Sequence, residues 1–232
     1  MTVFLISLCA CADGNGQNET PTPPPTSSAQ NEIPSASPDD SFAPTPQPSD
    51  SADPSAPVTP SGEVIVTFDY TKISGSASNQ WAIWIEDMDG NYINTVFATK
   101  WTAVGGHKTR PDSIAVWVEK SDIASMPDYY VDAISGATPK AGSQSYSWNL
   151  KDINGDTVSP GEYKVFVEGT LRWKNYVLYS GVITLDGNAV TVEADAEYVY
   201  EASDRQAALT SESPENTMIG TVTVRFVPAA DR

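Results

Sequence analysis

The sequence lacks several residue types that common activities require. The chain has one histidine, and both of its cysteines lie within the first eleven positions. The remainder therefore contains no disulfide, no cysteine-ligated metal and no cysteine nucleophile. One histidine does not build an ordinary zinc site, and there is no G-x-S-x-G nucleophile elbow. We expect a protein that is not an enzyme, with no metal site and no resident cofactor.

Positive charge is absent from the first quarter of the chain. All 13 Lys and Arg residues lie at or beyond Lys72, whereas seven acidic residues precede Gly62. The other 23 acidic residues, set against 13 basic ones, give residues 62–232 a net charge of −10. Phosphate binding needs a basic face, so nucleic acid is excluded as a partner, as is direct docking on anionic lipid.

The N-terminal residues are similar to the end of a bacterial lipoprotein signal. An apolar run at 3–10, too short to span a bilayer, leads into the stretch LCAC at 8–11. This stretch resembles a lipobox, which implies lipidation at Cys11. The chain departs from the pattern in one respect, because no Lys or Arg precedes the apolar run. We expect an extracytoplasmic protein that meets the bacterial membrane or cell surface through a lipid anchor only.

Composition divides the chain into three segments. Residues 1–11 are predicted to be a lipoprotein signal remnant. Residues 12–61 form a Pro/Ser/Thr-rich linker with too little apolar surface to offset the entropy of ordering, so a disordered tether is expected. Residues 62–232 are predicted to form one folded domain, because apolar and polar residues begin to alternate there.

The folded segment is predicted to contain many short strands and no helix of ordinary length. The nearest helical candidate, 201–210, is short. Turn residues at 86–91 and at 185–188 predict two hairpins. The fold class is therefore all-β, an Ig-like antiparallel β-sandwich preceded by a disordered tether. Strands are predicted at 63–70, 81–86, 93–99, 114–119, 145–150, 163–170, 176–185, 190–194 and 220–227.

Two resemblances support this fold. The stretch SYSWNLKDINGDTVSPGEYKVFVEG, 145–169, resembles the W…D…G…V…PG-Y pattern of Ig-like domains of the flagellar-hook-capping and secreted type, with Trp148 and Tyr163 as core aromatics. The order WAIWIEDMDGNYINTV, RPDSIAVW, DAISGATPK and MIGTVTVRF, within 63–228, resembles the bacterial family called domain of unknown function 2271, described as predicted periplasmic proteins. That resemblance implies a fold and a compartment, and no activity.

One short stretch suggests specific chemistry. The segment DAISGAT at 132–138 resembles the D-x-x-S-G-A-T motif of FMN-binding domains, in which a transferase joins FMN through its phosphate to the threonine hydroxyl. The resemblance implies Thr138 as the acceptor, with Asp132, Ser135 and Gly136 as recognition elements. Pro139 and Lys140 replace the small or hydroxyl residues that usually follow the threonine. The alternative is a turn-rich connector in which Pro139 holds Thr138 extended.

Other polar groups have simpler interpretations. Two turns place oxygen ligands at alternate positions, as calcium loops do, but neither continues as an EF-hand, so turn formation is favoured. The single His107 is predicted to be a solvent-facing loop residue. Most tryptophans, Trp84 and Trp117 among them, are predicted to pack in the core, with Trp173, Tyr176 and the pair at 129–130 as exposed exceptions. The calcium candidates are Asp87, Asp89 and Asn91, and Asp152, Asn154 and Asp156.

Two functional hypotheses remain open. The first is a non-enzymatic, surface-anchored lipoprotein whose Ig-like domain binds or supports a cell-envelope protein or glycan. The second is a covalent flavoprotein that carries FMN on the SGAT loop and serves extracytoplasmic electron transfer.

Overall fold

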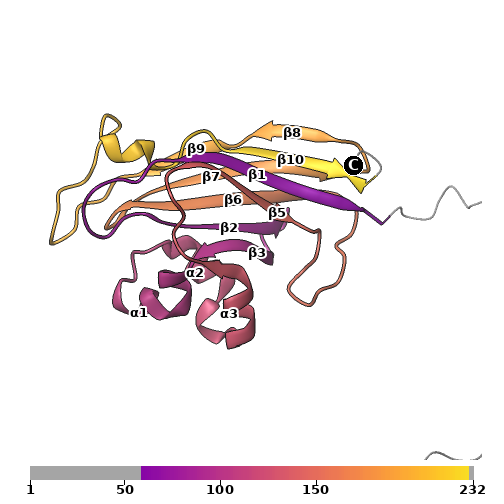
Figure 1. Ribbon diagram of the computed structural model, residues 1–232, viewed down its shortest axis with the longest axis horizontal. Helices are drawn as coiled ribbons and strands as arrows, with labels where there is room; N and C mark the ends of the chain where they lie inside the picture. The colour runs from indigo at the N-terminus through magenta and orange to yellow at the C-terminus, as the bar shows by residue number, and fades with distance from the viewer. Residues whose placement is uncertain (1–58, 230–232) are drawn as a thin grey trace, which may run out of the picture. The chain divides into compact units, whose positions relative to one another are not determined.

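The computed structural model describes residues 59–229, and this part is a sandwich of two β-sheets with helices against one of them (Figure 1). The first sheet has four strands in the order β5-β1-β10-β8, and the second has six in the order β4-β3-β2-β6-β7-β9. The sandwich is the fold class that the alternating sequence predicted. The strands are β1 (Gly62–Tyr70), β2 (Gln80–Asp87), β3 (Tyr92–Thr99), β4 (Ser135–Gly136), β5 (Gly142–Trp148), β6 (Gly161–Arg172), β7 (Asn175–Leu185), β8 (Val190–Glu193), β9 (Asp195–Val199) and β10 (Thr223–Pro228).

The main hydrophobic core lies between the two sheets. Alternate residues of β1, among them Val64, Val66 and Phe68, are buried there, as a period of two residues requires. Trp148 of β5 meets Tyr163 of β6 edge to face, with ring centroids 5.8 Å apart. Because these two strands belong to different sheets, the aromatic pair joins the sheets at one end of the core. Both residues are core aromatics, as predicted.

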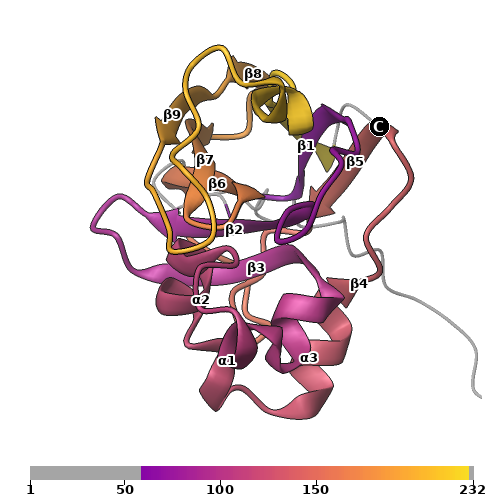
Figure 2. The same ribbon diagram turned by 90° about the vertical axis from the view of Figure 1, so that its left-hand side faces the viewer.

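A helical layer covers the outer face of the six-stranded sheet (Figure 2). It is formed by the chain between β3 and β4. The layer packs on Ala82 and Trp84 of β2, whose neighbours Trp81 and Ile83 face the opposite way into the sandwich. Its elements are η1 (Thr102–Gly106), α1 (His107–Thr109), α2 (Ala115–Ser121), η2 (Ile123–Ser125) and α3 (Asp128–Ile134).

The helical layer corrects one predicted strand. Residues 114–119 were expected to be extended, and instead α2 spans Ala115–Ser121. Apolar β-branched residues favour strands when nothing else intervenes. Here tertiary contacts select the helix, because Glu168 of β6 accepts hydrogen bonds from the N–H groups of Val116 and Trp117 in its first turn. The indole Nε1 of Trp117 also donates to Thr95 Oγ1 at 2.8 Å.

One predicted hairpin was wrong. The turn at 185–188 does not close a hairpin, because β7 pairs with β9 while β8 pairs with β10 in the other sheet. That turn therefore carries the chain from one sheet to the other. Residues 201–210, the nearest helical candidate in the sequence, form no helix, which agrees with the expectation of no ordinary helix there. The short strand β9 was not predicted. The hairpin at 86–91 is confirmed, since β2 and β3 pair antiparallel.

Several predictions lie outside the described residues. These are the lipidation of Cys11, the signal remnant at 1–11 and the disordered linker at 12–61, of which only the last residues are described. All three stay predictions. Between residues 59 and 229, no helix is long and apolar enough to cross a membrane.

Candidate functional site

The residues of the DAISGAT motif lie where the helical layer returns to the sandwich. Asp132 lies in the last turn of α3, and Ser135 and Gly136 form the two-residue strand β4. Thr138 lies in the connector that crosses from β4 to β5 in the other sheet. Both Asp132 and Thr138 are exposed, and the described part of the protein offers the Thr138 hydroxyl no hydrogen-bond partner. The acceptor predicted from the motif is therefore accessible.

The middle of the motif is fixed in place rather than displayed. Strand β4 pairs parallel with the end of β3, with Ala98 opposite Ser135 and Thr99 opposite Gly136. A Cβ at Gly136 would lie 2.7 Å from Cε2 of Phe97, so any other residue here would force the Phe97 ring to shift. The Ser135 hydroxyl is enclosed and has no partner within residues 59–229. Ser135 and Gly136 thus determine the path of the connector that exposes Thr138.

Asp132 is available at the surface. Its carboxylate lies 3.6 Å from Nζ of Lys100, and the two side chains are 70% and 55% exposed. An ion pair this exposed contributes little to stability, so it does not commit the carboxylate to a structural role.

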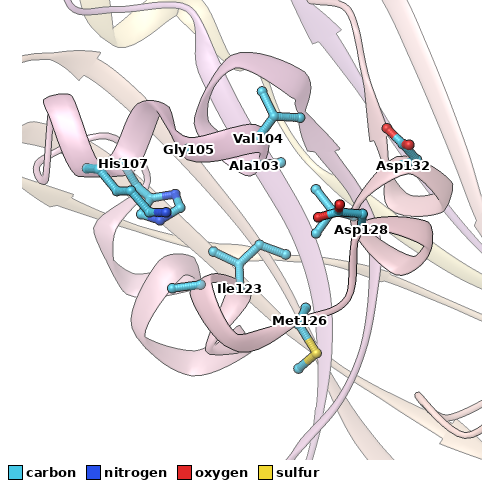
Figure 3. Close-up of a pocket in the computed structure, with 11 residues that line it drawn as sticks. Ala103, Val104, Gly105, His107, Ile123, Met126, Asp128 and Asp132 are labelled. Carbon is cyan, nitrogen blue, oxygen red and sulfur yellow. The ribbon is translucent and has the colours of Figure 1, made fainter. Parts of the chain in front are cut away.

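A pocket of about 300 Å³ lies beside the motif, within the helical layer. Residues of η1, α1, η2 and α3 line it, and Asp132 belongs both to its wall and to the motif. Figure 3 shows His107 on one side of the pocket, Asp128 and Asp132 on the other, and Ile123 and Met126 between them. Polar surface exceeds apolar surface in its lining, whereas most small-molecule sites are mainly apolar.

His107 is buried, which corrects the prediction of a solvent-facing residue. Its side chain is 9% exposed, and Nδ1 lies 2.9 Å from the carbonyl oxygen of Thr102. Because a carbonyl oxygen only accepts, Nδ1 of His107 donates this hydrogen bond. Nε2 has no partner in the described part of the chain. His107 therefore holds η1 against α1 and forms part of the pocket wall.

Two buried carboxylates hold the pocket's helical layer on the sheet. Glu168 is fully buried, and burial raises its pKa to about 7 despite the hydrogen bonds from Trp117 and Val116. Glu86 is 4% exposed and accepts from Nζ of Lys120 at 3.1 Å and from Nε1 of Trp84 at 2.8 Å. One carboxylate thus binds the start of α2 and the other its last turn. Sequence reasoning missed both residues.

The packing of α3 is set by a partly buried network of hydroxyl groups. The Tyr130 hydroxyl lies 2.8 Å from that of Tyr92 and donates to Oδ1 of Asn94 at 2.9 Å. The Tyr92 hydroxyl also lies 2.6 Å from Oγ1 of Thr95, and burial raises the pKa of Tyr92 far above its usual value. These bonds fix α3 on β3, and with it the position of Asp132.

The two candidate calcium turns use their carboxylates internally. Asp87 accepts hydrogen bonds from the backbone N–H groups of Asp89 and Asn91. It also accepts one from the side-chain amide of Asn91, and this hydrogen bond lowers the pKa of Asp87. Asp152 is bonded in the same way by Asn154 and Asp156. Nowhere in residues 59–229 do three or more His, Cys, Asp or Glu side chains gather closely enough to hold a metal ion. The carboxylates of Asp87 and Asp152 therefore stabilise their own turns through hydrogen bonds.

The aromatic predictions were right for the core and mixed for the surface. Trp84 and Trp117 are fully buried, although they pack between the sheet and the helices rather than between the sheets. Tyr129 is 79% exposed, whereas Trp173 is half-buried beneath Arg205, whose guanidinium lies 4.9 Å from the ring centroid. Trp101, 44% exposed, was not predicted to be at the surface.

The described residues form a two-sheet β-sandwich with a helical layer inserted between β3 and β4 and with Thr138 exposed on the connector after β4. The chain belongs to the family described as predicted periplasmic protein (DUF2271), whose model matches residues 62–201. This range includes the helical layer, the pocket and the whole motif. The family description supports an extracytoplasmic location. No curated protein and no solved structure matches the chain, so the likeness to hook-capping Ig-like domains stays a prediction.

Proposed function

We propose that this protein is an extracytoplasmic electron carrier of the cell envelope that holds FMN covalently on Thr138. The observation that carries the proposal is the exposure of Thr138 on a connector whose preceding residues are fixed by β4. A separate transferase must bring a flavin phosphate to the acceptor oxygen. The transferase needs an accessible hydroxyl on a backbone segment of defined path.

The attachment balances as a simple group transfer. The Thr138 oxygen forms a bond to the flavin-bearing phosphorus of a flavin dinucleotide, and the phosphoanhydride bond of that donor breaks. The adenine nucleotide leaves, and the hydroxyl proton passes to solvent or to the transferase. Asp132 is exposed near the same end of the connector, where the transferase can recognise its carboxylate.

The local structure is compatible with this role despite the departure at Pro139. A residue before proline is restricted to extended conformations, and Thr138 is exposed in this connector. Pro139 is half-buried and Lys140 is exposed. Once attached, FMN would supply one- and two-electron chemistry, while the chain's own residues display the acceptor and attach it to the sandwich.

The anchor is part of the same proposal. We infer that Cys11 is lipidated, which would keep the carrier at the membrane surface where electron donors and acceptors meet. A Cys11→Ser variant is expected to leave the membrane fraction and to appear in the soluble extracytoplasmic fraction, whereas the wild-type protein stays with the membrane.

A non-enzymatic binding or accessory module for an envelope protein or glycan is the second candidate. The exposed aromatic rings of Tyr129 and Trp101 on the helical layer favour it, since such rings are common in binding surfaces. The two candidates differ in one property, because only the flavin carrier acquires a covalent chromophore.

The experiment is coexpression of the full chain with a flavin transferase, followed by denaturing electrophoresis and detection of in-gel flavin fluorescence. Wild type should give a fluorescent band and Thr138→Ala should not. Thr109→Ala, which removes an exposed threonine outside the motif, serves as the matched control and should fluoresce like wild type. A dark wild-type band beside a fluorescent control substrate would reject the proposal and leave the binding module.

A further inference from the structure

We propose that a second pocket, at the turn between β6 and β7, binds a non-lipid phosphate ester of the cell envelope. Its volume is about 240 Å³, and three separate segments line it: 109–112 at the end of α1, the turn residues 173–174, and the loop at 203–205. The inference is independent of flavin attachment, because none of these residues belongs to the DAISGAT motif.

The lining gathers positive charge on a strongly acidic protein. Arg110, Lys174 and Arg205 all line the pocket, although residues 62–232 carry a net charge of −10. Asp112 and Asp204 line it as well, so three cations face two carboxylates. The net charge opposes binding along an extended phosphate backbone, which needs a basic face. It does not oppose binding of a single phosphate group in a locally basic pocket.

The two arginines are held by tryptophan rings rather than by carboxylates. The guanidinium of Arg205 lies 4.9 Å from the centroid of the Trp173 ring. That of Arg110 lies 4.8 Å from the centroid of the Trp101 ring. Among residues 59–229, neither guanidinium forms an ion pair with a carboxylate. A guanidinium stacked on an aromatic face directs its N–H groups sideways, in the fork geometry that matches phosphate oxygens.

The guanidinium of Arg110 is fixed in position and its charge is incompletely compensated. Its Nη2 donates a hydrogen bond to Oγ of Ser113 at 2.8 Å, which holds it at the pocket wall. Burial lowers the pKa of Arg110, although the nearby charge of Asp112 opposes that shift. A half-buried positive charge without a paired carboxylate is stabilised when an anion binds beside it.

The backbone at Trp173 has an unfavourable conformation. Its φ of 52° lies in the left-handed region, which is rare for a bulky side chain. The Trp173 N–H donates to the carbonyl oxygen of Ala77 at 2.9 Å, and this hydrogen bond holds the turn. The turn carries the indole beneath Arg205 in the pocket wall. Strained backbone of this kind is concentrated at functional and ligand sites.

A phosphate fits these donors better than a carboxylate does. Nζ of Lys174 is already bonded to Glu201 at 2.8 Å, so the two guanidiniums are the cations of the lining that lack a carboxylate partner within residues 59–229. Two guanidiniums from different segments can bind separate oxygens of a tetrahedral phosphate, whereas a planar carboxylate presents both oxygens to one guanidinium. The volume of about 240 Å³ suits a phosphate with a small alcohol such as glycerol and not a nucleotide.

The test is calorimetric titration of the full chain with glycerol phosphate. The parent chain for all measurements carries Cys11→Ser, so that no lipid anchor contributes. Arg205→Gln removes an exposed guanidinium from the pocket, and Arg225→Gln makes the same change at an exposed position of β10 outside it. We expect Arg205→Gln to raise Kd about tenfold or more, since hydrogen bonds to charged groups are strong, and Arg225→Gln to leave Kd unchanged. Asp204→Asn should lower Kd, because it removes a competing carboxylate from the lining.

Three results of the titrations would overturn the proposal. They are the absence of saturable binding up to about 10 mM glycerol phosphate, equal Kd values for the parent chain and Arg205→Gln, and acetate binding as tight as that of glycerol phosphate. Vesicles of phosphatidylglycerol present the phosphate at a membrane surface, and the net charge of −10 predicts that the chain does not sediment with them. Sedimentation that Arg205→Gln abolishes would assign the pocket to a lipid headgroup and overturn the choice of a non-lipid ester.

Discussion

Glu168→Gln should abolish a pH dependence of stability that the buried carboxylate creates. Burial raises the pKa of Glu168 to about 7, above the value of 4.5 expected in the unfolded chain. The folded state therefore binds this proton more tightly, and stability is fully present below about pH 4.5 and is lost as the pH rises through about 7. The difference corresponds to about 3 kcal/mol between the two limits.

The assay is urea denaturation at pH 5 and pH 8, monitored by tryptophan fluorescence. Other titrating groups are common to both proteins, so the free energy of unfolding of the variant minus that of wild type isolates Glu168. We expect this difference to favour the variant by about 2–3 kcal/mol more at pH 8 than at pH 5, because part of the full effect already lies below pH 5. Glu162→Gln, at an exposed position of the same strand, should show no such change. A difference that is equal at the two pH values would refute the account of a buried carboxylate beneath α2.

Two further substitutions test the core and the motif. Trp148→Ala should lower the free energy of unfolding by about 3–5 kcal/mol, because it removes a side chain that is 2% exposed and joins the two sheets. A loss below about 1 kcal/mol in urea denaturation would contradict that packing. Gly136→Ala should cost about 1–3 kcal/mol, since its Cβ would meet the Phe97 ring. The double variant Gly136→Ala/Phe97→Ala should cost less than the sum of the two single changes, and simple additivity would argue against the contact.

The strands of the sandwich were predictable because one face of each is buried. In β1 the buried residues Val64, Val66 and Phe68 alternate with less buried neighbours, which is the pattern that a period of two residues detects. The pairing of the later strands was not predictable in the same way. Turn residues after Leu185 show that the chain bends, but they do not determine which strand becomes the partner.

The helical layer was missed although the sequence contains a sign of it. The run from Trp81 to Ile85 is apolar at every position, and such a run indicates a strand covered on both faces. The short helix α2 has seven residues, too few for helical periodicity to emerge, and its β-branched residues favour a strand. Contacts with Glu168 and Thr95, distant in the sequence, stabilise the helix instead.

The sequence could name the residues of the motif but not those of the pocket. The motif residues are adjacent in the sequence, so a resemblance finds Thr138 and Asp132 without knowledge of the fold. The pocket combines residues of η1, η2 and α3 that share no sequence pattern, and only their packing around Ile123 and His107 brings them together. The burial of His107 follows from that packing, and a lone histidine after two glycines gave no signal of it.

Flavin attachment is tested most directly by peptide mass mapping of the protein recovered from the bacterial envelope. We expect the peptide that contains Thr138 to gain the mass of one FMN less one water in the wild-type protein, and the matching peptide of the Thr138→Ala variant to gain nothing. That variant should keep wild-type stability within roughly half a kcal/mol, because the side chain is exposed. An unmodified Thr138 peptide from cells that contain an active flavin transferase would contradict flavin attachment.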